Sequence, residues 1–356
     1  MAVTMKDIAR DLGVSVVTVS KAIRSHNDIS EETRKRVLKR AQQLNYHPNL
    51  AARALVTGKT YAVGLIVPDL VHPFFAEVAM GLSNALRRKN YSLLISSSEE
   101  DPRLECQEVE RLLSRAVDGI VIASAQCTVE SFRRIEENKT PYVLIDRRFS
   151  GLPANFVGVD DVAVGRLATQ HLVSVGCKRI AHIQGPATST ALGRLEGYNQ
   201  ALAANNLGPF TGYVVPARSG DVEAYSTGTE SMSKLVRLNP RPDGVFCYND
   251  PIGIGAIDTI LRAGLRVPED IAVIGCGNLH YDKSLCVPLS SVDQQSVAIG
   301  EAAAKLILLL IGARTPPRPK SIILEARVVA RASTQRDPAC EGQRRDASIS
   351  AARAAI

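Results

Sequence analysis

Residues 5–24 read MKDIARDLGVSVVTVSKAIR, and they decide the fold of the first part of the chain. The spacing of their apolar residues predicts one helix over about Lys6–Leu12 and a second over about Val16–Arg24. Between them, Gly13 can adopt the left-handed conformation that ends a helix, and Ser15 is a residue type that caps the next helix. Two helices joined by so short a glycine-containing turn are the signature of a helix-turn-helix unit.

The second helix of this unit has an outward face suited to DNA. Val19 and Ile23 are four residues apart and are expected to face the core. The outward positions are then Val16, Val17, Thr18, Ser20, Lys21 and Arg24. Exposed valines suit contact with thymine methyl groups in a major groove, and hydroxyl groups and cations suit phosphates. The alternative is an ordinary helical cap whose valines pack under a loop.

A third helix completes an all-α headpiece over residues 1–46. Ser30 is expected to cap it, and the helix itself is predicted over about Glu31–Leu44. Its inward residues are predicted to be Val37, Leu38, Ala41 and Leu44, and its other face carries Arg34, Lys35, Lys39 and Arg40. The formal net charge of the 356-residue chain is +7, and +6 of it falls within residues 1–60. A local basic segment on a neutral body is typical of a polyanion-binding module, although a solvated basic face gives the same composition.

Residues 47–60 are predicted to be a hinge. The segment Tyr46–Asn49 breaks the third helix at a proline. Asn49–Val56 has a helical composition, but its length is below the roughly 12–15 residues that an isolated helix needs in water. Thr57–Thr60 then reads as a linker. We therefore expect a segment that becomes helical only when it is bound.

From Tyr61 onward the sequence alternates short apolar runs with amphipathic helices, which predicts an α/β fold with parallel sheets. The predicted strands are Ala62–Val67, Ser92–Ser96, Gly119–Ala123, Tyr142–Ile145, Phe156–Val159, Arg179–Ile183, Gly212–Val215, Gly244–Cys247, Ile271–Ile274 and Ser321–Arg327. The predicted helices are Pro73–Lys89, Arg103–Arg115, Val162–Val175, Arg194–Asn205, Tyr225–Leu238, Ile252–Ala263 and Ile299–Ile311. The similar runs Asp118-Gly119-Ile120-Val121 and Asp243-Gly244-Val245-Phe246 indicate two similar lobes. Residues 335–356 are polar and rich in Arg, Ala and Ser, which predicts a disordered tail.

Several classes of protein are disfavoured by composition and by missing motifs. No apolar run reaches about 18 residues, and the N-terminus lacks the apolar core of a secretory signal, so a cytoplasmic protein is expected. The seven cysteines and six histidines show no metal-ligand spacing, so neither a metal nor a cofactor is expected. The chain also lacks a phosphate-binding GxxxxGK[ST] loop and a GxSxG motif, and its Gly253–Asp258 stretch is no dinucleotide loop. An enzyme is therefore not expected.

The sequence as a whole resembles the lactose/galactose repressor (LacI/GalR) family of bacterial transcription regulators. Residues 5–60 resemble its headpiece and hinge. Further runs follow in the family's order: VGLIVPDLVHPFFAEVAMGL, DGIVIAS, VGVDDVAVGRLATQHLVSVGCKRIAHI, GRLEGYNQAL, DGVFCYND, GLRVPEDIAVIGCGN and PLSSVDQQ. This resemblance covers about residues 4–334 and implies a homodimeric regulator, expected to be a repressor, that binds a pseudo-palindromic operator and a small effector.

The resemblance also implies a core over 61–334 like that of periplasmic binding proteins. Its first lobe is expected over about 61–161 and 292–320, and its second over about 162–291 and 321–334. The effector, a sugar, a sugar acid or a related metabolite, would bind in the cleft between the lobes. The sequence leaves open whether that effector is an inducer or a corepressor.

The family's functional positions can be placed on this chain one by one. Groove-reading side chains fall on Val16, Val17 and Lys21, and phosphate contacts fall on Thr18, Ser20, Arg24 and Ser30. Ser15 is a further DNA-binding position. In the hinge, Asn49 begins the helix, Arg53 is a minor-groove or phosphate cation, and Leu55 is an apolar wedge between base steps. The effector positions fall on Asp69, Phe74, Ser124, Asp146, Thr190, Arg194, Asn249, Asp250 and Gln294.

The sequence departs from the family pattern in three places. Gly277 stands where an acidic residue is common, and Val159 and Val222 stand where aromatic residues often stack on the ligand. Phe74 is then expected to be the one aromatic wall of the cleft. The family's C-terminal leucine heptads are absent from residues 347–356, which favours a dimer over a tetramer.

Two other hypotheses about the function remain. A solute-binding protein for uptake would share the two-lobed core, but the basic headpiece and the missing signal sequence oppose it. An enzyme on a doubly wound sheet would share the fold class, but it would need one of the motifs that are missing.

Overall fold

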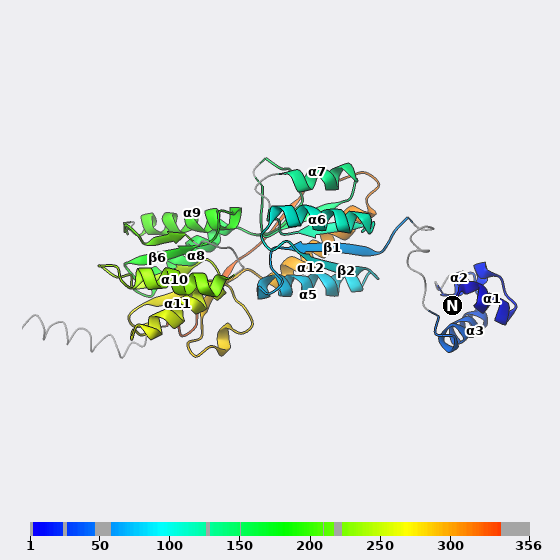
Figure 1. Ribbon diagram of the computed structural model, residues 1–356, viewed down its shortest axis with the longest axis horizontal. Coiled ribbons are helices and arrows are strands. Elements are labelled where there is room, and N and C mark those ends of the chain that lie inside the picture. Colours follow the sequence, from blue (N-terminus) through cyan, green and yellow to red (C-terminus); the bar gives the residue numbers. More distant parts are fainter. Residues whose placement is uncertain are drawn as a thin grey trace, which may run out of the picture. The chain divides into compact units, whose positions relative to one another are not determined.

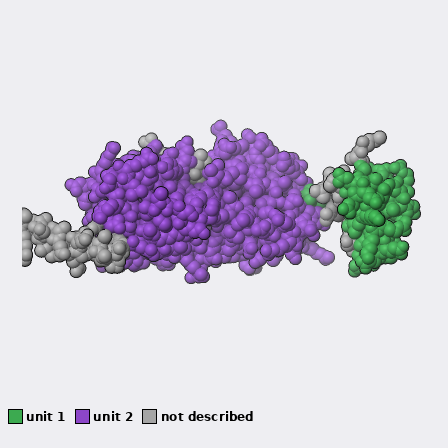
Figure 2. All heavy atoms as spheres, turned by 90° about the horizontal axis from the view of Figure 1, so that it is seen from below, with its two compact units in different colours: residues 1–60 green, residues 61–356 purple. Residues whose placement is uncertain are grey.

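The computed structural model describes residues 3–23, 27–46, 58–125, 129–149, 151–208, 210–216 and 223–335. Two compact units make up the chain, residues 1–60 and residues 61–356, and Figure 2 colours them separately. Several expectations lie outside the described residues: the hinge helix with Asn49, Arg53 and Leu55, the predicted phosphate contact Arg24, Val222, and the tail beyond residue 335.

The first unit contains three helices around a small apolar core. These are α1 (Met5–Leu12), α2 (Val16–Ile23) and α3 (Glu31–Gln43). Their buried core consists of Ile8, Ala9, Val19, Ala22, Val37 and Ala41. The prediction that Leu38 faces inward is wrong, because its side chain is 45% exposed. Val37 and Ala41, four residues apart, point at α1 and α2, and Leu38 is rotated about 100° away from them around the helix.

The first lobe of the second unit is built on a six-stranded parallel sheet (Figure 1). Its order is β11 (Ser321–Leu324), β5 (Phe156–Val159), β4 (Tyr142–Ile145), β3 (Gly119–Ile122), β1 (Ala62–Val67) and β2 (Ser92–Ser97). Helices α5 (Pro73–Arg87) and α12 (Ser296–Gly312) cover one face. Helices α6 (Pro102–Ser114) and α7 (Glu130–Glu137) cover the other.

The second lobe repeats this arrangement around a second six-stranded sheet. Its order is β12 (Arg327–Val329), β10 (Ser290–Asp293), β9 (Ala272–Gly277), β8 (Gly244–Cys247), β6 (Ile180–Gln184) and β7 (Val214–Pro216). Only the β10–β12 pair among these is antiparallel. Its helices are α8 (Asp161–Ser174), α9 (Ser189–Ala204), α10 (Ala224–Leu235), α11 (Asp250–Arg262) and the short η1 (Asp282–Ser284).

The chain passes between the lobes three times. The crossings fall between β5 and α8, between β10 and α12, and between β11 and β12. The predicted single strand Ser321–Arg327 is wrong, because the chain leaves the first sheet after Leu324 and enters the second at Arg327. The expected lobe boundary at residues 320 and 321 therefore moves to the Leu324–Arg327 segment. The Ser321–Arg327 segment contains no Gly or Pro that would mark the point at which the chain changes sheets.

Three elements were not expected from the sequence. They are α7, the short η1 and β10, which consists of Ser290, Ser291, Val292 and Asp293. Both serines of β10 are fully buried and hydrogen-bonded through their side chains. A buried strand made largely of polar residues carries no hydrophobic period, which explains why the sequence pattern missed it.

Candidate DNA interface and effector cleft

The turn of the helix-turn-helix forms as the sequence predicts. Gly13 ends α1 with a φ of 65°, in the left-handed region that glycine adopts without steric cost. Ser15 then caps α2, because its Oγ accepts a hydrogen bond from the Thr18 amide at 3.0 Å. Ser30 does the same for α3, accepting from the Thr33 amide at 3.3 Å. These local bonds satisfy backbone amides in the first turns of α2 and α3.

The outward face of α2 is apolar at its first turn. Val16 is 38% exposed and Val17 is 62% exposed, so neither valine is packed under a loop of the described headpiece. Thr18, Ser20 and Lys21 are partly exposed on the same helix. Such a surface carries methyl groups and short hydroxyl groups at the helix start, the part of a recognition helix that reaches base edges.

In the second unit, nine residues surround a cavity between the two lobes. They are His72, Phe74, Phe75, Asp146, Arg194, Tyr248, Asn249, Cys276 and Gln294. Five of them, Phe74, Asp146, Arg194, Asn249 and Gln294, are positions that the sequence resemblance indicated. His72, Phe74 and Phe75 come from the start of α5, and Arg194 comes from α9. Tyr248 comes from the loop after β8, and Cys276 comes from β9.

Arg194 is the central polar residue of the cavity wall, and its guanidinium is 97% buried. Its Nε donates to Asp161 at 3.0 Å, its Nη1 to the Tyr248 carbonyl at 2.7 Å, and its Nη2 to Gln294 at 2.8 Å. The guanidinium also lies over the Tyr248 ring, 4.6 Å from its centroid. Burial raises the pKa of Asp161, and the charge of Arg194 opposes that shift. The buried cation is thus held in place by protein groups from three elements.

Close packing of α8 against α9 determines the position of Arg194 in the cleft. A Cβ atom added to Gly165 on α8 would lie 2.0 Å from the carbonyl oxygen of Arg194. A Cβ atom added to Gly197 on α9 would lie 2.0 Å from the carbonyl oxygen of Val162. The two glycines let α8 and α9 approach backbone to backbone, which brings Asp161 at the start of α8 next to Arg194.

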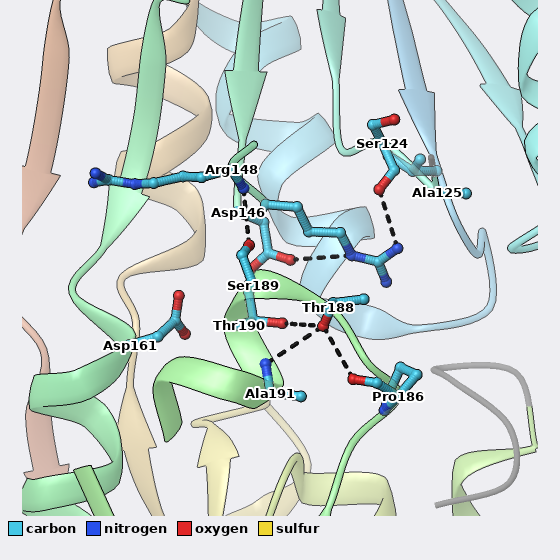
Figure 3. A network of polar contacts seen from close by, with 12 residues as sticks. Ser124, Ala125, Asp146, Arg148, Asp161, Pro186, Thr188, Ser189, Thr190 and Ala191 are labelled. Atoms are coloured by element: carbon cyan, nitrogen blue, oxygen red, sulfur yellow. Dashed lines mark hydrogen bonds and ion pairs between the residues drawn. The ribbon is translucent and has the colours of Figure 1, made fainter. Parts of the chain in front are cut away.

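Four predicted effector residues do not line the cavity. Thr190 contacts Tyr248, which lines the cavity, and its Oγ1 lies 2.8 Å from the Tyr248 hydroxyl. Ser124 donates to Glu105 at 2.6 Å, and Asp69 accepts from the Val71 amide at 2.7 Å. Asp250 is fully buried under the floor of the cleft. Figure 3 shows Ser124, Asp146 and Thr190 at the facing edges of the two lobes.

The expectation of a single aromatic wall is wrong. Phe75, Tyr248 and the imidazole of His72 also line the cavity with Phe74. Phe74 and Phe75 meet edge to face with ring centroids 5.1 Å apart. The signals for these residues were present in the sequence, as a Phe-Phe pair at a helix start and a Tyr after a buried strand. Val159 is 5% exposed and packs into the core of the second lobe, outside the wall of this cavity.

The lobes are closed on each other around this cavity. Asn249 Nδ2 lies 3.3 Å from His72 Nε2, and the Arg148 amide donates to Ser189 across the cleft at 2.9 Å (Figure 3). Leu279, from the loop after β9, is buried in the core of the first lobe. The cavity that these nine residues line measures about 20 Å³, which is room for about one water molecule.

The described residues show neither a metal cluster nor a membrane helix. No group of three or more His, Cys, Asp or Glu side chains within them is arranged to hold a metal ion. In the same part of the chain, no helix has the length and apolarity required to span a bilayer.

Comparison with known proteins connects both units to one family. A profile described as "Bacterial regulatory proteins, lacI family" matches residues 4–49, and one described as "Periplasmic binding protein-like domain" matches residues 169–334. The chain is 31% identical over 334 residues to the HTH-type transcriptional repressor PurR of Actinobacillus pleuropneumoniae serotype 3 (strain JL03), covering 93% of this chain and 98% of that protein.

Solved structures agree with this relationship. The transcriptional regulator CelR–cellobiose complex is 27% identical, with a TM-score of 0.71 over 93% of this chain and 99% of that one. The lac repressor dimer bound to operator and the anti-inducer ONPF has a TM-score of 0.82 over 94% of this chain and 100% of that one, and at 23% identity it shows the shared fold. The chain belongs to the lacI family of bacterial regulatory proteins and is a transcriptional regulator of that family.

Proposed function

We propose that this regulator binds operator DNA through α2 as a homodimer. The observation that carries the proposal is the pair of exposed valines, Val16 and Val17, at the start of a correctly capped recognition helix. Val16, Val17 and Lys21 would read bases in the major groove. Ser15, Thr18, Ser20, Arg24 and Ser30 would contact phosphates and fix the register of the headpiece.

The hinge residues extend this interface into the minor groove. Asn49 would begin a hinge helix that forms on DNA, Arg53 would supply a cation, and Leu55 would insert as an apolar wedge. Unstacking one base step costs a few kcal/mol, and the resulting bend brings more DNA surface against the protein. These three residues lie outside the described part of the chain, so their roles come from the family resemblance.

The effector is a small polar molecule that binds between the lobes. Arg194, Asn249, Gln294 and Asp146 supply hydrogen-bonding groups from both lobes to one cavity. The four predicted effector residues that do not line the cavity would support those that do. They are Asp69, Ser124, Thr190 and Asp250. The CelR structure contains cellobiose, and an effector of the sugar, sugar-acid or related-metabolite class would suit the donors and acceptors here.

Effector control would act through the closure of the lobes. The hydrogen bond from the Arg148 amide to Ser189 joins the two lobes, and a bound effector would shift the balance between this arrangement and more open ones. A coupling of about 1–3 kcal/mol would change operator affinity roughly 5–150-fold. The regulator would act in the cytoplasm as a repressor, without catalysis.

The second copy would pack against α5 and β2. Strand β2 is the edge of its sheet, and an apolar groove of about 380 Å³ runs beside it. Met80 on α5 and Ile95 on β2 line this groove and are 51% and 47% exposed. Exposed apolar patches beside a sheet edge are characteristic of interfaces.

The test is selection of DNA from a random pool with the purified protein. Enrichment of a two-fold palindrome of roughly 14–20 base pairs, with half-sites about one helical turn apart, supports a dimer that reads DNA with two headpieces. Selections with and without candidate metabolites would then identify an effector that changes the recovery of the same sequence. An enriched motif without two-fold symmetry would contradict the dimeric arrangement. If no sequence is enriched under any of these conditions, the result contradicts the proposed DNA interface.

A further inference from the structure

The recognition helix α2 (VVTVSKAI) has one charged residue, Lys21. It follows Val17 by four residues, so both side chains belong to the same face of the helix. The ammonium group of Lys21 forms an ion pair with Asp28, in the segment between α2 and α3. The side chains of Lys21 and Asp28 are 40% and 52% exposed, so the pair lies at the headpiece surface. An acidic residue thus holds the cation of the face that we assign to DNA.

The other aspartates of the described headpiece pair elsewhere. Asp7 binds Arg10 on α1 at 2.9 Å, and Asp11 binds Arg40 on α3 at 2.6 Å. Neither of these cations belongs to α2. Asp28 is therefore distinguished from Asp7 and Asp11 by its partner and not by its charge.

We propose that Asp28 restrains Lys21 and thereby lowers the affinity of the headpiece for DNA of any sequence. The phosphate oxygens of the DNA must compete for Lys21 with the carboxylate that already holds it. Base-edge acceptors such as guanine O6 and N7 must compete with the carboxylate in the same way. Because Lys21 has to be released from Asp28 in either case, the carboxylate weakens binding to matched and to unmatched DNA. This inference rests on the proposed function, since it requires Lys21 to face DNA.

The experiment measures binding of the full chain to a fluorescent duplex of arbitrary sequence over a range of salt concentrations. Breaking an exposed ion pair changes affinity by up to about 5-fold per headpiece, and by up to about 25-fold for two headpieces. We expect Asp28→Asn to tighten generic binding within that range at low salt. Releasing one lysine per headpiece should also steepen the log–log salt dependence by about 0.9 for each phosphate gained.

Asp11→Asn is the matched control, because it removes the same charge and an ion pair that does not involve α2. A general electrostatic effect would make the two variants equivalent. Equal changes in affinity and salt slope for Asp28→Asn and Asp11→Asn would overturn the proposal. A larger gain in affinity and a steeper salt slope for Asp28→Asn, on generic DNA and on a selected operator, is the expected result.

The variant Lys21→Met distinguishes a failure of this inference from a failure of the proposed function. In the Lys21→Met background, Asp28→Asn should tighten binding no more than Asp11→Asn does, because the restrained cation is gone. If Asp28→Asn keeps its full effect there, Asp28 acts by another route and the proposal fails. If Lys21→Met leaves binding to generic and selected DNA unchanged, Lys21 is not at the interface and the inference falls, while the random-pool selection still tests the headpiece as a whole.

Discussion

Replacing His182 by phenylalanine should remove a pH dependence from the stability of the second lobe. His182 lies on β6, fully buried, with its ring stacked on Phe246 at a centroid distance of 4.6 Å. Its Nδ1 donates to the Phe246 carbonyl at 3.0 Å, while its Nε2 is buried and has no hydrogen-bond partner among the described residues. The imidazole is therefore held neutral, and protonation would place a charge in an apolar layer.

The magnitude follows from the difference in pKa between the folded and unfolded chain. Burial lowers the pKa of His182 from 6.5 to about 4. Because the folded pKa is the lower one, the unfolded chain takes up the proton first as the pH falls, and the folded state is destabilised. Between pH 7 and pH 5 this linkage costs about 2 kcal/mol, and it is complete only below pH 4.

Urea unfolding, followed by far-ultraviolet circular dichroism at pH values from 5 to 8, would measure this effect. The quantity compared is the loss of unfolding free energy between pH 7 and pH 5 in the wild type and in His182→Phe. We expect the variant to lose about 2 kcal/mol less than the wild type, since all other titrating groups are shared. Phe246→Leu is the control, because it disturbs the same ring stack without changing a titratable group. Parallel losses in wild type and His182→Phe would refute the reasoning, because the buried imidazole would then titrate as it does in the unfolded chain.

Three further predictions concern the cleft and the interfaces. Arg194→Ala should abolish the effector response in a DNA-binding titration while operator affinity without effector is retained, and an unchanged effector titration would place the ligand elsewhere. Gly197→Ala should lower the unfolding free energy by about 1–3 kcal/mol, because the new Cβ would meet the Val162 carbonyl at 2.0 Å. Gly208→Ala, with no heavy atom within 4 Å of the new Cβ, should be close to neutral, and urea unfolding of both variants measures the difference. Met80→Glu should convert a dimer into monomers in sedimentation velocity, and an unchanged mass would exclude the α5 groove as the dimer face.

The sequence predicted the secondary structure well where burial has a clear period. Strands Ala62–Val67 and Gly244–Cys247 occur with the predicted bounds, because they are apolar runs buried on both faces of a parallel sheet. The pattern failed where the buried residues are polar, as in β10, and where one predicted strand is divided between two sheets, as in Ser321–Arg327. Both failures depend on contacts distant in sequence, which no local period contains.

The sequence also predicted only some of the individual side chains that line the cleft. Arg194 and Gln294 were indicated by resemblance, and the structure brings their side chains within 2.8 Å across 100 residues of chain. Tyr248 was missed, although it lies next to the indicated Asn249. Its role depends on the carbonyl that binds Arg194 and on the ring beneath the guanidinium, and both follow from how β8 and α9 meet.

The glycine at position 277 and the burial of Asp250 are parts of one structural feature. A Cβ atom on Gly277 would lie 2.8 Å from Asp250 Oδ2, and one on Gly275 would lie 2.2 Å from Oδ1. The absence of both side chains makes room for the Asp250 carboxylate, which accepts from the Ser291 hydroxyl at 2.6 Å and the Leu279 amide at 3.2 Å. Asp250 is therefore held under the floor of the cleft, and among the described residues that line the cavity the carboxylate is that of Asp146, from the first lobe. If the effector binds in this cavity, its hydroxyl or amine group would bind the carboxylate of Asp146 on the first lobe. The guanidinium of Arg194 would face the same effector from the second lobe. The ligand would then have to bridge the lobes to satisfy both groups, which is the property that allows a bound molecule to control their closure.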